Sequence, residues 1–223
     1  MTAVFLQVRL SSQRYPRKAL ALLGDRTVFE RCLQALSAVK TALHVVVTEP
    51  QSLAELSPLA RALGWDVFSG PEDHVLERFV LAAREFRVTT VVRATGDNPL
   101  VSAHLANLLL ARHLRKTSQY SGFQGGPLGS GVEVLDVAAL ETALASQPDT
   151  HEAEHVSPFL YRRPQAFRID RPPVPKKFRH PEGSITLDTL DDGAYLEALW
   201  TELNPIAPPE LEAVIPWLKT HPR

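Results

Sequence analysis

The sequence predicts an α/β fold, with three αβα layers around a mostly parallel, Rossmann-like central sheet. Short buried apolar runs alternate with longer amphipathic stretches through the first half of the chain. The amphipathic stretches are long enough to be crossover helices, which join parallel strands and cover both faces of a sheet. At 223 residues with 44% hydrophobic content, the chain can bury one large core, or one core and a small lobe.

In the first half, strands are expected where apolar residues run continuously, and helices where they recur every three or four positions. The expected strands cover residues 3–8, 43–48, 65–68 and 89–94. The expected helices cover residues 28–39, 52–63, 74–86 and 102–115. Each helix separates two strands, so right-handed parallel crossovers are predicted.

The second half is less regular. Residues 122–131 contain five glycines and one proline, which predicts a mobile or tightly turned loop with the capacity to act as a lid. Strands are expected at 132–135, 166–170 and 184–187, and helices at 137–145, 152–161 (interrupted near Pro158), 191–203 and 208–218. No linker demands a second domain, so one domain is expected over residues 1–223.

Composition excludes several classes of function. A formal charge of −1 gives no broad basic field for nucleic acid or a membrane surface. The single cysteine, Cys32, permits no internal disulfide, fits a reducing cytoplasm and reads as a small buried apolar residue. Without a secretory leader or a run of 18 apolar residues, we expect a soluble, cytoplasmic protein.

A cationic loop follows the first expected strand, with the pattern R-x4-R-x-P-x-K from Arg9 to Lys18. Loops at the carboxyl ends of strands are where open α/β sheets bind ligands. Four cations in ten residues repel one another, so an anionic guest such as a nucleoside triphosphate is expected. The loop lacks the Walker pattern G-x4-G-K-[ST]. The alternative interpretation is a solvated basic surface loop.

Two aspartates occupy similar positions after strands. Asp97 lies in a Gly-Asp-Asn-Pro turn after the strand at 89–94, and Asp188 follows the expected strand at 184–187. Such carboxylates suit Mg²⁺, which takes one or two protein carboxylates together with substrate phosphates. The alternatives are a simple turn for Asp97 and a helix N-cap for Asp188. Because Thr189 or Asp191 could cap that helix instead, Asp188 is free to face a metal.

These pieces together resemble the cytidylyltransferase family that includes acylneuraminate and 3-deoxy-manno-octulosonate cytidylyltransferases. The likeness is greater to the branch of spore-coat polysaccharide biosynthesis proteins, and it runs from Val4 to about Leu196. Its landmarks in order are Gln7-Val-Arg9 with Ser12-x-Arg14-x-Pro16-x-Lys18, Asp73-His-Val-Leu-Glu-Arg78-Phe, Val92-Arg93-Ala-Thr-Gly96-Asp97-Asn-Pro99-Leu100, Gly131-Val-Glu133-Val, Glu154-His155-Val-Ser-Pro158, and Leu187-Asp188-Thr189.

The resemblance implies a fold of the nucleotide-diphospho-sugar transferase type. Residues 1–118 would form the nucleotide-binding half, 119–190 the sugar-site half and 191–223 the carboxyl-terminal helices. The implied reaction couples CTP to an acidic sugar, giving a CMP-sugar and pyrophosphate for surface polysaccharide biosynthesis. Mg²⁺ would be the cofactor, and a homodimer is expected.

The resemblance also implies roles for individual residues. The triphosphate would be held by Arg9 and Lys18 with Arg14 assisting, and Ser12 would lie near the base. Arg9, Lys18 and Asp97 would be the catalytic residues, and Asp97 and Asp188 the magnesium ligands.

The resemblance implies roles for three further residues. Arg78 would contact the nucleoside side of the pocket, the alternative being a surface helix arginine. Glu133 and His155 would face the sugar, and His155 is alternatively an ordinary residue of an amphipathic helix.

The chain departs from the family pattern in places. Relatives usually have glycine where Ser11 and Arg17 stand, and Asn98 is more often Cys or Glu. Leu190 replaces the start of a Pro-Glu-Asp run. These changes put the nucleotide preference of the loop in question.

A basic segment covers residues 162–180, where seven Lys and Arg residues face one acidic residue, Asp170. It is either a solubilising surface or an electrostatic patch for an acidic sugar, a phosphorylated acceptor or a partner subunit.

Two competing functions stay open at this point. A UDP- or GDP-sugar pyrophosphorylase or a GT-A-like glycosyltransferase has a neighbouring fold, and fold alone does not determine chemistry. Such glycosyltransferases generally carry an Asp-x-Asp motif, whereas Thr95-Gly96-Asp97 supplies one aspartate. The non-enzymatic alternative is a nucleotide-binding subunit, which need not keep two metal carboxylates.

Overall fold

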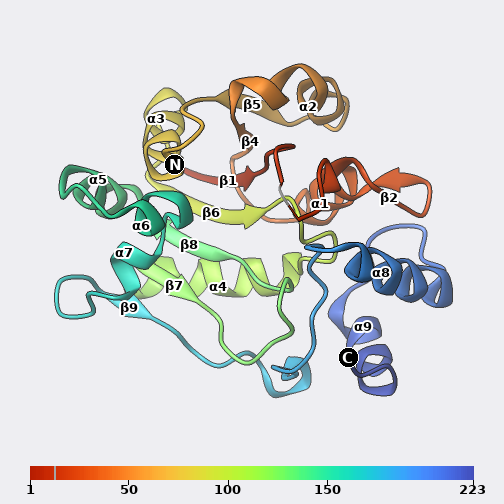
Figure 1. Ribbon diagram of the computed structural model, residues 1–223. Coiled ribbons are helices and arrows are strands. Elements are labelled where there is room, and N and C mark those ends of the chain that lie inside the picture. The colour runs from red at the N-terminus through yellow and green to blue at the C-terminus, as the bar shows by residue number, and fades with distance from the viewer. Residues whose placement is uncertain (13) are drawn as a thin grey trace.

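Four of the apolar runs form a parallel sheet, and three shorter strands extend it. The computed structural model describes residues 1–12 and 14–223, so one spacer residue of the cationic loop lies outside the described residues. The strands in sheet order are β5 (Asp66–Ser69), β4 (Leu43–Thr48), β1 (Thr2–Gln7), β6 (Thr90–Thr95), β8 (Glu133–Asp136), β7 (Tyr120–Gly122) and β9 (Ile169–Asp170) (Figure 1). Of these, β8 alone runs against its neighbours. The mostly parallel sheet is confirmed.

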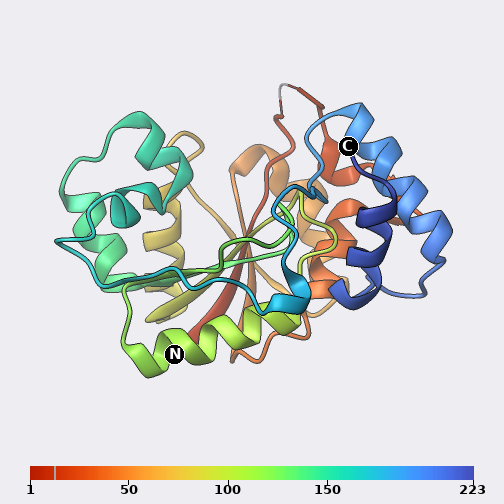
Figure 2. The ribbon, with the colours of Figure 1, turned by 90° about the horizontal axis from the view of Figure 1, so that it is seen from below.

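Side chains alternate between the two faces of the sheet, and each face has its own apolar core. On β1, Val4 and Leu6 pack into one core, whereas Ala3 and Phe5 pack into the other. The first core is covered by α1 (Val28–Leu36), α2 (Pro50–Ala62), α4 (Ala103–Lys116), α8 (Leu190–Leu203) and α9 (Leu211–Thr220). The second is covered by α3 (Val75–Glu85), α5 (Val137–Ala145) and α7 (Pro158–Tyr161), with α6 (Thr150–His155) beside α3. Figure 2 shows helices on both sides of the sheet, which confirms the three-layer prediction.

The second half differs from the prediction in three places. Residues 184–187 form no named strand: the N–H of Ile185 donates to Leu128 O at 2.9 Å, and the N–H of Leu187 donates to Asp97 O at 2.8 Å. The segment is extended, but loops rather than sheet strands satisfy its backbone. The expected helix at 152–161 is interrupted as predicted, but the break between α6 and α7 begins at Val156, whose φ is 69°, two residues before Pro158. The strand expected at 166–170 shortens to β9.

Three short strands were not predicted from the sequence. These are β7 and the hairpin of β2 (Leu22–Leu23) with β3 (Arg26–Thr27). Segments of two or three residues are too short for a periodic pattern.

The glycine-rich loop at 122–131 is tightly turned and held from one side. Its backbone pairs with the segment 172–185, including the N–H of Leu128 donating to Gly183 O at 2.8 Å and the N–H of His180 donating to Gly125 O at 2.9 Å. Gly129 has a φ of 88°, and a Cβ there would lie 2.9 Å from Asn98 Oδ1. A larger residue at this position would therefore displace Asn98, beside Asp97.

Asp170 of the edge strand β9 forms ion pairs with α4. This carboxylate, 11% exposed, accepts from Arg112 Nη2 at 3.0 Å and from Lys116 Nζ at 3.1 Å. The hydrogen bond from Arg112 is the main cause that lowers the pKa of Asp170, followed by that from Lys116 against the opposing effect of burial. The folded-state pKa therefore lies below the unfolded value of about 3.9.

We expect Asp170→Asn to lower the free energy of unfolding at neutral pH. Because the folded-state pKa is depressed, this stabilisation is present above the unfolded value and disappears as pH falls through the folded-state pKa. Urea unfolding of both proteins at pH 7, 5 and 3 measures the difference, which should shrink toward the lowest pH. Asp66→Asn, at an exposed residue of β5, is the control. A difference independent of pH would contradict the ion pair.

Two further expectations bear on the whole chain. Cys32 is fully buried, and burial raises the pKa of its thiol, so it packs as a small apolar residue as predicted. Within the described ranges, 1–12 and 14–223, no helix combines the length and the apolar character needed to cross a bilayer.

Candidate active site

Two aspartates distant in sequence converge on one lysine at the carboxyl end of the parallel strands. Asp97 follows β6, Asp188 precedes α8, and Lys18 begins the 3-10 helix η1 (Lys18–Leu20) that follows β1. Lys18 Nζ lies 2.9 Å from Asp97 Oδ2, 2.8 Å from Asp188 Oδ1 and 2.7 Å from the Leu187 carbonyl oxygen. The two carboxylates therefore meet as expected, with the ammonium group of Lys18 between them.

The charge of Lys18 is firmly maintained. Its side chain is 13% exposed, and burial by itself would lower the pKa. The charges and hydrogen bonds of Asp97 and Asp188 outweigh burial and raise the pKa of Lys18 above its ordinary value. The group is thus a cation throughout the physiological pH range.

Local structure orients each carboxylate. Asp97 Oδ1 accepts from Thr95 Oγ1 at 2.6 Å, and that hydroxyl accepts from Asn98 Nδ2 at 2.8 Å. A Cβ at Gly96 would lie 2.8 Å from the Val8 side chain, so this turn requires glycine. These contacts aim Asp97 away from the sheet and toward Lys18.

Asp188 does not cap α8, because its neighbour Thr189 does so. The Thr189 hydroxyl accepts from the Asp192 N–H, and Asp192 Oδ2 accepts from the N–H groups of Asp188 and Thr189 at 2.9 and 2.7 Å. The predicted release of Asp188 from the capping role is confirmed, with Thr189 as the cap.

The cations of the first loop have partners within the chain. Arg14 lies 3.2 Å from Asp188, Arg9 lies 3.0 Å from Glu154 of α6, and Arg17 Nη1 lies 2.8 Å from Glu55 of α2. The expectation that only an anionic guest could offset their repulsion was therefore wrong. Arg9, Arg14 and Arg17 remain at least 47% exposed, so solvent or a phosphate can compete for them. Ser12 lies half-buried in the same loop.

The backbone conformation of Arg17 fits the glycine that relatives are expected to have at this position. Its φ is 59° and its ψ is 24°, which is the left-handed conformation that glycine adopts most readily. A non-glycine residue there costs roughly 1–2 kcal/mol. The Glu55 contact directs the guanidinium away from Lys18, so the extra cation does not enter the cluster.

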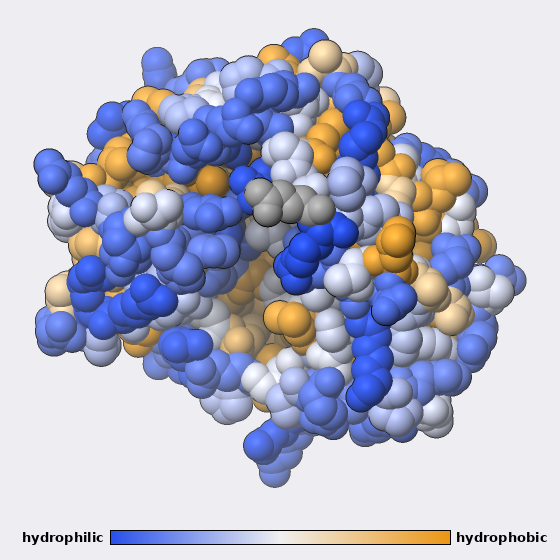
Figure 3. All heavy atoms as spheres, in the orientation of Figure 1, coloured by the Kyte–Doolittle hydropathy of each residue, from blue (hydrophilic) through white to orange (hydrophobic). Residues whose placement is uncertain are grey.

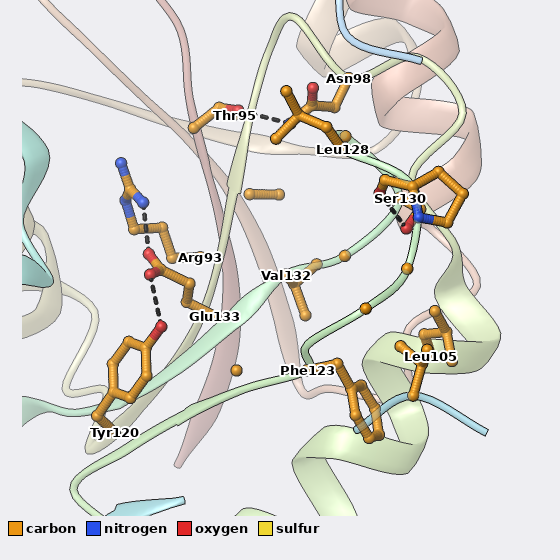
Figure 4. Close-up of a pocket in the computed structure, with 18 residues that line it drawn as sticks. Arg93, Thr95, Asn98, Leu105, Tyr120, Phe123, Leu128, Ser130, Val132 and Glu133 are labelled. Atoms are coloured by element: carbon orange, nitrogen blue, oxygen red, sulfur yellow. Dashed lines mark hydrogen bonds and ion pairs between the residues drawn. The ribbon is translucent and has the colours of Figure 1, made fainter. Parts of the chain in front are cut away.

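A pocket of about 360 Å³ opens beside the aspartate turn. It lies between the end of β6 and the glycine-rich loop, and Figure 3 shows the hollow near the centre of this face with hydrophilic residues around it. Thr95 and Asn98 form part of its wall, as Figure 4 shows, and Thr95 contacts Asp97. Its charged lining residues are Arg93 and Glu133. The pocket could therefore hold a polar molecule within reach of the Asp97 turn.

Glu133 belongs to a hydrogen-bonded network on the floor of this pocket. It accepts from Arg93 Nη1 at 2.5 Å and from Tyr120 Oη at 3.0 Å, as Figure 4 shows. It also accepts from Ser157 Oγ at 2.6 Å. Arg93 in turn donates to Gln7 Oε1 at 2.8 Å. Burial, followed by the charge of Glu133, raises the pKa of Tyr120, so its phenol stays a donor. Glu133 thus lines the pocket with its charge matched by Arg93, and its role at a sugar stays a prediction.

Breaking this network should be costly. We expect Arg93→Met to lower the free energy of unfolding by about 3 kcal/mol, because it leaves a partly buried carboxylate without its cation. Arg84→Met is the matched control: its pair with Glu141 is exposed by 60% and 41%, so its loss should cost under about 1 kcal/mol. Urea unfolding of both variants measures the two losses in the free energy of unfolding. Equal losses would contradict the prediction that the Arg93–Glu133 pair stabilises the protein more than the Arg84–Glu141 pair.

Two expected site residues, Arg78 and His155, do not line this pocket, and their roles at the nucleotide and the sugar stay predictions. Arg78 is 1% exposed and donates to the carbonyl oxygens of Pro71 and Glu72 at 2.6–2.8 Å, so it anchors the loop before α3 and is not a surface arginine. His155 is exposed at the end of α6, with its ring 4.4 Å from that of His151, and is not among the residues that line the pocket. Partial desolvation and the neighbouring His151 lower the pKa of His155.

The basic segment 162–180 is dispersed. Arg163 lies 2.6 Å from the buried Glu152, Lys177 lies 2.7 Å from Glu212, and Arg168 Nε donates to Thr117 O at 2.8 Å. These contacts fasten the segment to three different elements. They favour a structural surface over a single electrostatic patch.

Sequence reasoning did not assign roles to several residues of the site. These are Gln7, Arg93, Thr95, Tyr120 and Ser157. A usable signal was present for Gln7 and Arg93, because each is a large polar side chain next to apolar residues in a predicted strand. Tyr120 and Ser157 carry no such signal.

The described residues offer only small groups of possible metal ligands. Within residues 1–12 and 14–223, no group of three or more His, Cys, Asp and Glu residues is arranged to bind an ion. Asp97 and Asp188 form a pair, partly exposed at 26% and 32%. A pair of carboxylates fits Mg²⁺, which takes one or two protein carboxylates and keeps waters and substrate phosphates as its other ligands.

Several known proteins are similar to this chain in sequence or in fold. A family model described as cytidylyltransferase matches residues 3–206. The spore coat polysaccharide biosynthesis protein SpsF of Bacillus subtilis is 28% identical over 204 residues, covering 87% of this chain and 84% of SpsF. A solved cytidylyltransferase from Leptospira borgpetersenii has a TM-score of 0.90 at 21% identity, covering 99% and 94% of the two chains. A CMP:2-keto-3-deoxy-manno-octonic acid synthetase solved with CTP has a TM-score of 0.69 at 14% identity, covering 91% and 99%. At these identities the two solved structures establish the shared fold.

Proposed function

The chain belongs to the cytidylyltransferase family, and on that premise we propose that it couples CTP to a hydroxyl of an acidic sugar. The sugar oxygen forms a bond to the α-phosphorus of CTP, and the bond between that phosphorus and the bridging oxygen of the β-phosphate breaks. The products are a CMP-sugar and pyrophosphate, and the hydroxyl proton passes to solvent. The relative SpsF is described as a spore coat polysaccharide biosynthesis protein, which supports a role for the product in surface polysaccharide biosynthesis.

One observation carries the proposal: Asp97, Asp188 and Lys18 converge within hydrogen-bonding distance beside the pocket. Phosphoryl transfer depends mainly on positioning and charge neutralisation, so it needs such a cluster and no protein nucleophile. Lys18, with Arg14 next to Asp188, supplies positive charge for the triphosphate and the departing pyrophosphate. Arg9 lies in the same loop and can leave Glu154 for a phosphate.

The two aspartates would hold a divalent cation. A bound Mg²⁺ supplies charge neutralisation at the phosphates and lowers the pKa of an attacking hydroxyl. Asp97 is held in place for this by Thr95, and Asp188 by the capping arrangement at Thr189.

The pocket beside Asp97 would hold the sugar. Its wall includes Asn98, whose buried Oδ1 accepts no hydrogen bond within the described chain, and the Arg93–Glu133 network. Hydroxyl groups suit an unpaired acceptor of this kind. The acidic class of sugar is supported by the synthetase with the same fold, whose substrate is a keto-deoxy sugar acid.

A nucleotide screen tests this function. Isothermal titration against ATP, CTP, GTP and UTP with Mg²⁺ should show preference for CTP, and pyrophosphate release over a panel of sugar acids should identify the acceptor. Preference for UTP or GTP with sugar 1-phosphates would favour a pyrophosphorylase. Binding of CTP without pyrophosphate release across that panel would favour a non-catalytic nucleotide-binding subunit.

A further inference from the structure

All three donors of the Lys18 ammonium group are engaged within the chain. A lysine ammonium has three N–H donors and no acceptor. Here the three acceptors are Asp97 Oδ2, Asp188 Oδ1 and the Leu187 carbonyl oxygen, all within 2.9 Å. The same group therefore cannot hold these three acceptors and a phosphate at once. Binding of a triphosphate by Lys18 requires the ammonium group to leave at least one of these three acceptors, two of which are the aspartates.

The position of Lys18 also opposes a metal ion. A divalent cation held by these aspartates would lie close to the ammonium group, which already occupies Asp97 Oδ2 and Asp188 Oδ1, so like charges would come close together. The Lys18 side chain is only 13% exposed, so water screens this repulsion weakly. The ammonium group and the metal thus compete for the same two carboxylates.

We propose that Lys18 is an internal counter-ion that keeps Asp97 and Asp188 from binding a divalent cation until a nucleotide triphosphate draws it away. This inference rests on the proposed function. The triphosphate removes the competing cation and adds phosphate oxygens as metal ligands, so metal and nucleotide bind cooperatively. By linkage, each raises the affinity of the other by the same factor. In the absence of a nucleotide, the two aspartates therefore bind free metal weakly.

Manganese binding without nucleotide tests the counter-ion directly. Mn²⁺ titrations of the full chain, followed by electron paramagnetic resonance, compare the wild type with Lys18→Met, which retains length and loses charge. We expect Mn²⁺ to bind Lys18→Met at least about tenfold more tightly, within the usual range of coupling between sites. Lys219→Met, at an exposed lysine of α9, should leave Mn²⁺ affinity unchanged.

A second variant and a separate readout complete the test. Lys18→Gln keeps a hydrogen-bond donor for the aspartates and protects against loss of fold, and it should also bind Mn²⁺ more tightly than the wild type. Equal or weaker Mn²⁺ binding by both folded variants overturns the counter-ion proposal, and leaves the proposed function standing if the wild type releases pyrophosphate from CTP. Tighter Mn²⁺ binding without CTP turnover by the wild type supports the counter-ion and overturns the proposed function alone.

Discussion

Replacing Asp97 with asparagine should reduce pyrophosphate release from CTP by about 10²–10³-fold, equivalent to about 3–4 kcal/mol of transition-state stabilisation. The amide has the shape of the carboxylate but lacks its charge, so it can neither pair with Lys18 nor hold a divalent cation well. The fold should be retained, because the side chain is 26% exposed on a turn.

The control for Asp97→Asn is Asp191→Asn, which removes an exposed carboxylate three residues after Asp188. It should keep the wild-type rate. Both variants should show wild-type circular dichroism spectra, which separates a loss of chemistry from a loss of fold. A rate for Asp97→Asn within a factor of two of the wild type would remove Asp97 from the catalytic centre.

Lys18→Ala should have the second large effect, a loss of turnover of about 10²–10³-fold. The variant loses the cation that would stabilise charge on the departing pyrophosphate, and its KM for CTP should rise because the triphosphate loses a contact. Steady-state kinetics of pyrophosphate release measure both quantities. The loss of turnover should persist at saturating Mg²⁺, because metal binding by the aspartates does not replace the phosphate contact.

Lys219→Ala serves as the control for Lys18→Ala, since it removes a lysine from the exposed face of α9. A Lys18→Ala enzyme with a raised KM and an unchanged kcat would mean that Lys18 binds ground state and transition state equally. That outcome would contradict a role for Lys18 at the leaving group.

Much of the fold was predictable because the first half is strongly periodic. The apolar run of β4 was identified at its observed limits, and those of β1 and β6 to within one residue at each end. The meeting of Asp97 and Asp188 was also predictable, since both follow apolar segments that end near one edge of the sheet. The second of these segments was expected as a strand and is an extended loop, yet its backbone pairing with Asp97 still delivers Asp188 to the site.

The pairing of the loop cations could not be predicted. Glu55 and Glu154 lie about 40 and 145 positions from their arginine partners, and only tertiary packing brings α2 and α6 to the first loop. The sequence of the loop contains the cations but not their carboxylate partners. It therefore predicted a more positively charged loop than the structure has.

The floor of the pocket escaped prediction for a similar reason. Glu133, Tyr120 and Arg93 come from three adjacent strands, and β8 enters the sheet antiparallel between β6 and β7. The strand β7 is too short to be recognised from its pattern, so the cross-strand contact of Tyr120 with Glu133 was invisible in the sequence.

A crystal structure with a non-hydrolysable CTP analogue and Mn²⁺ tests the central claim most directly. Anomalous scattering should place manganese between the carboxylates of Asp97 and Asp188, with a phosphate oxygen as a further ligand and Lys18 Nζ moved onto the triphosphate. Manganese and triphosphate bound away from these two aspartates would contradict the claim.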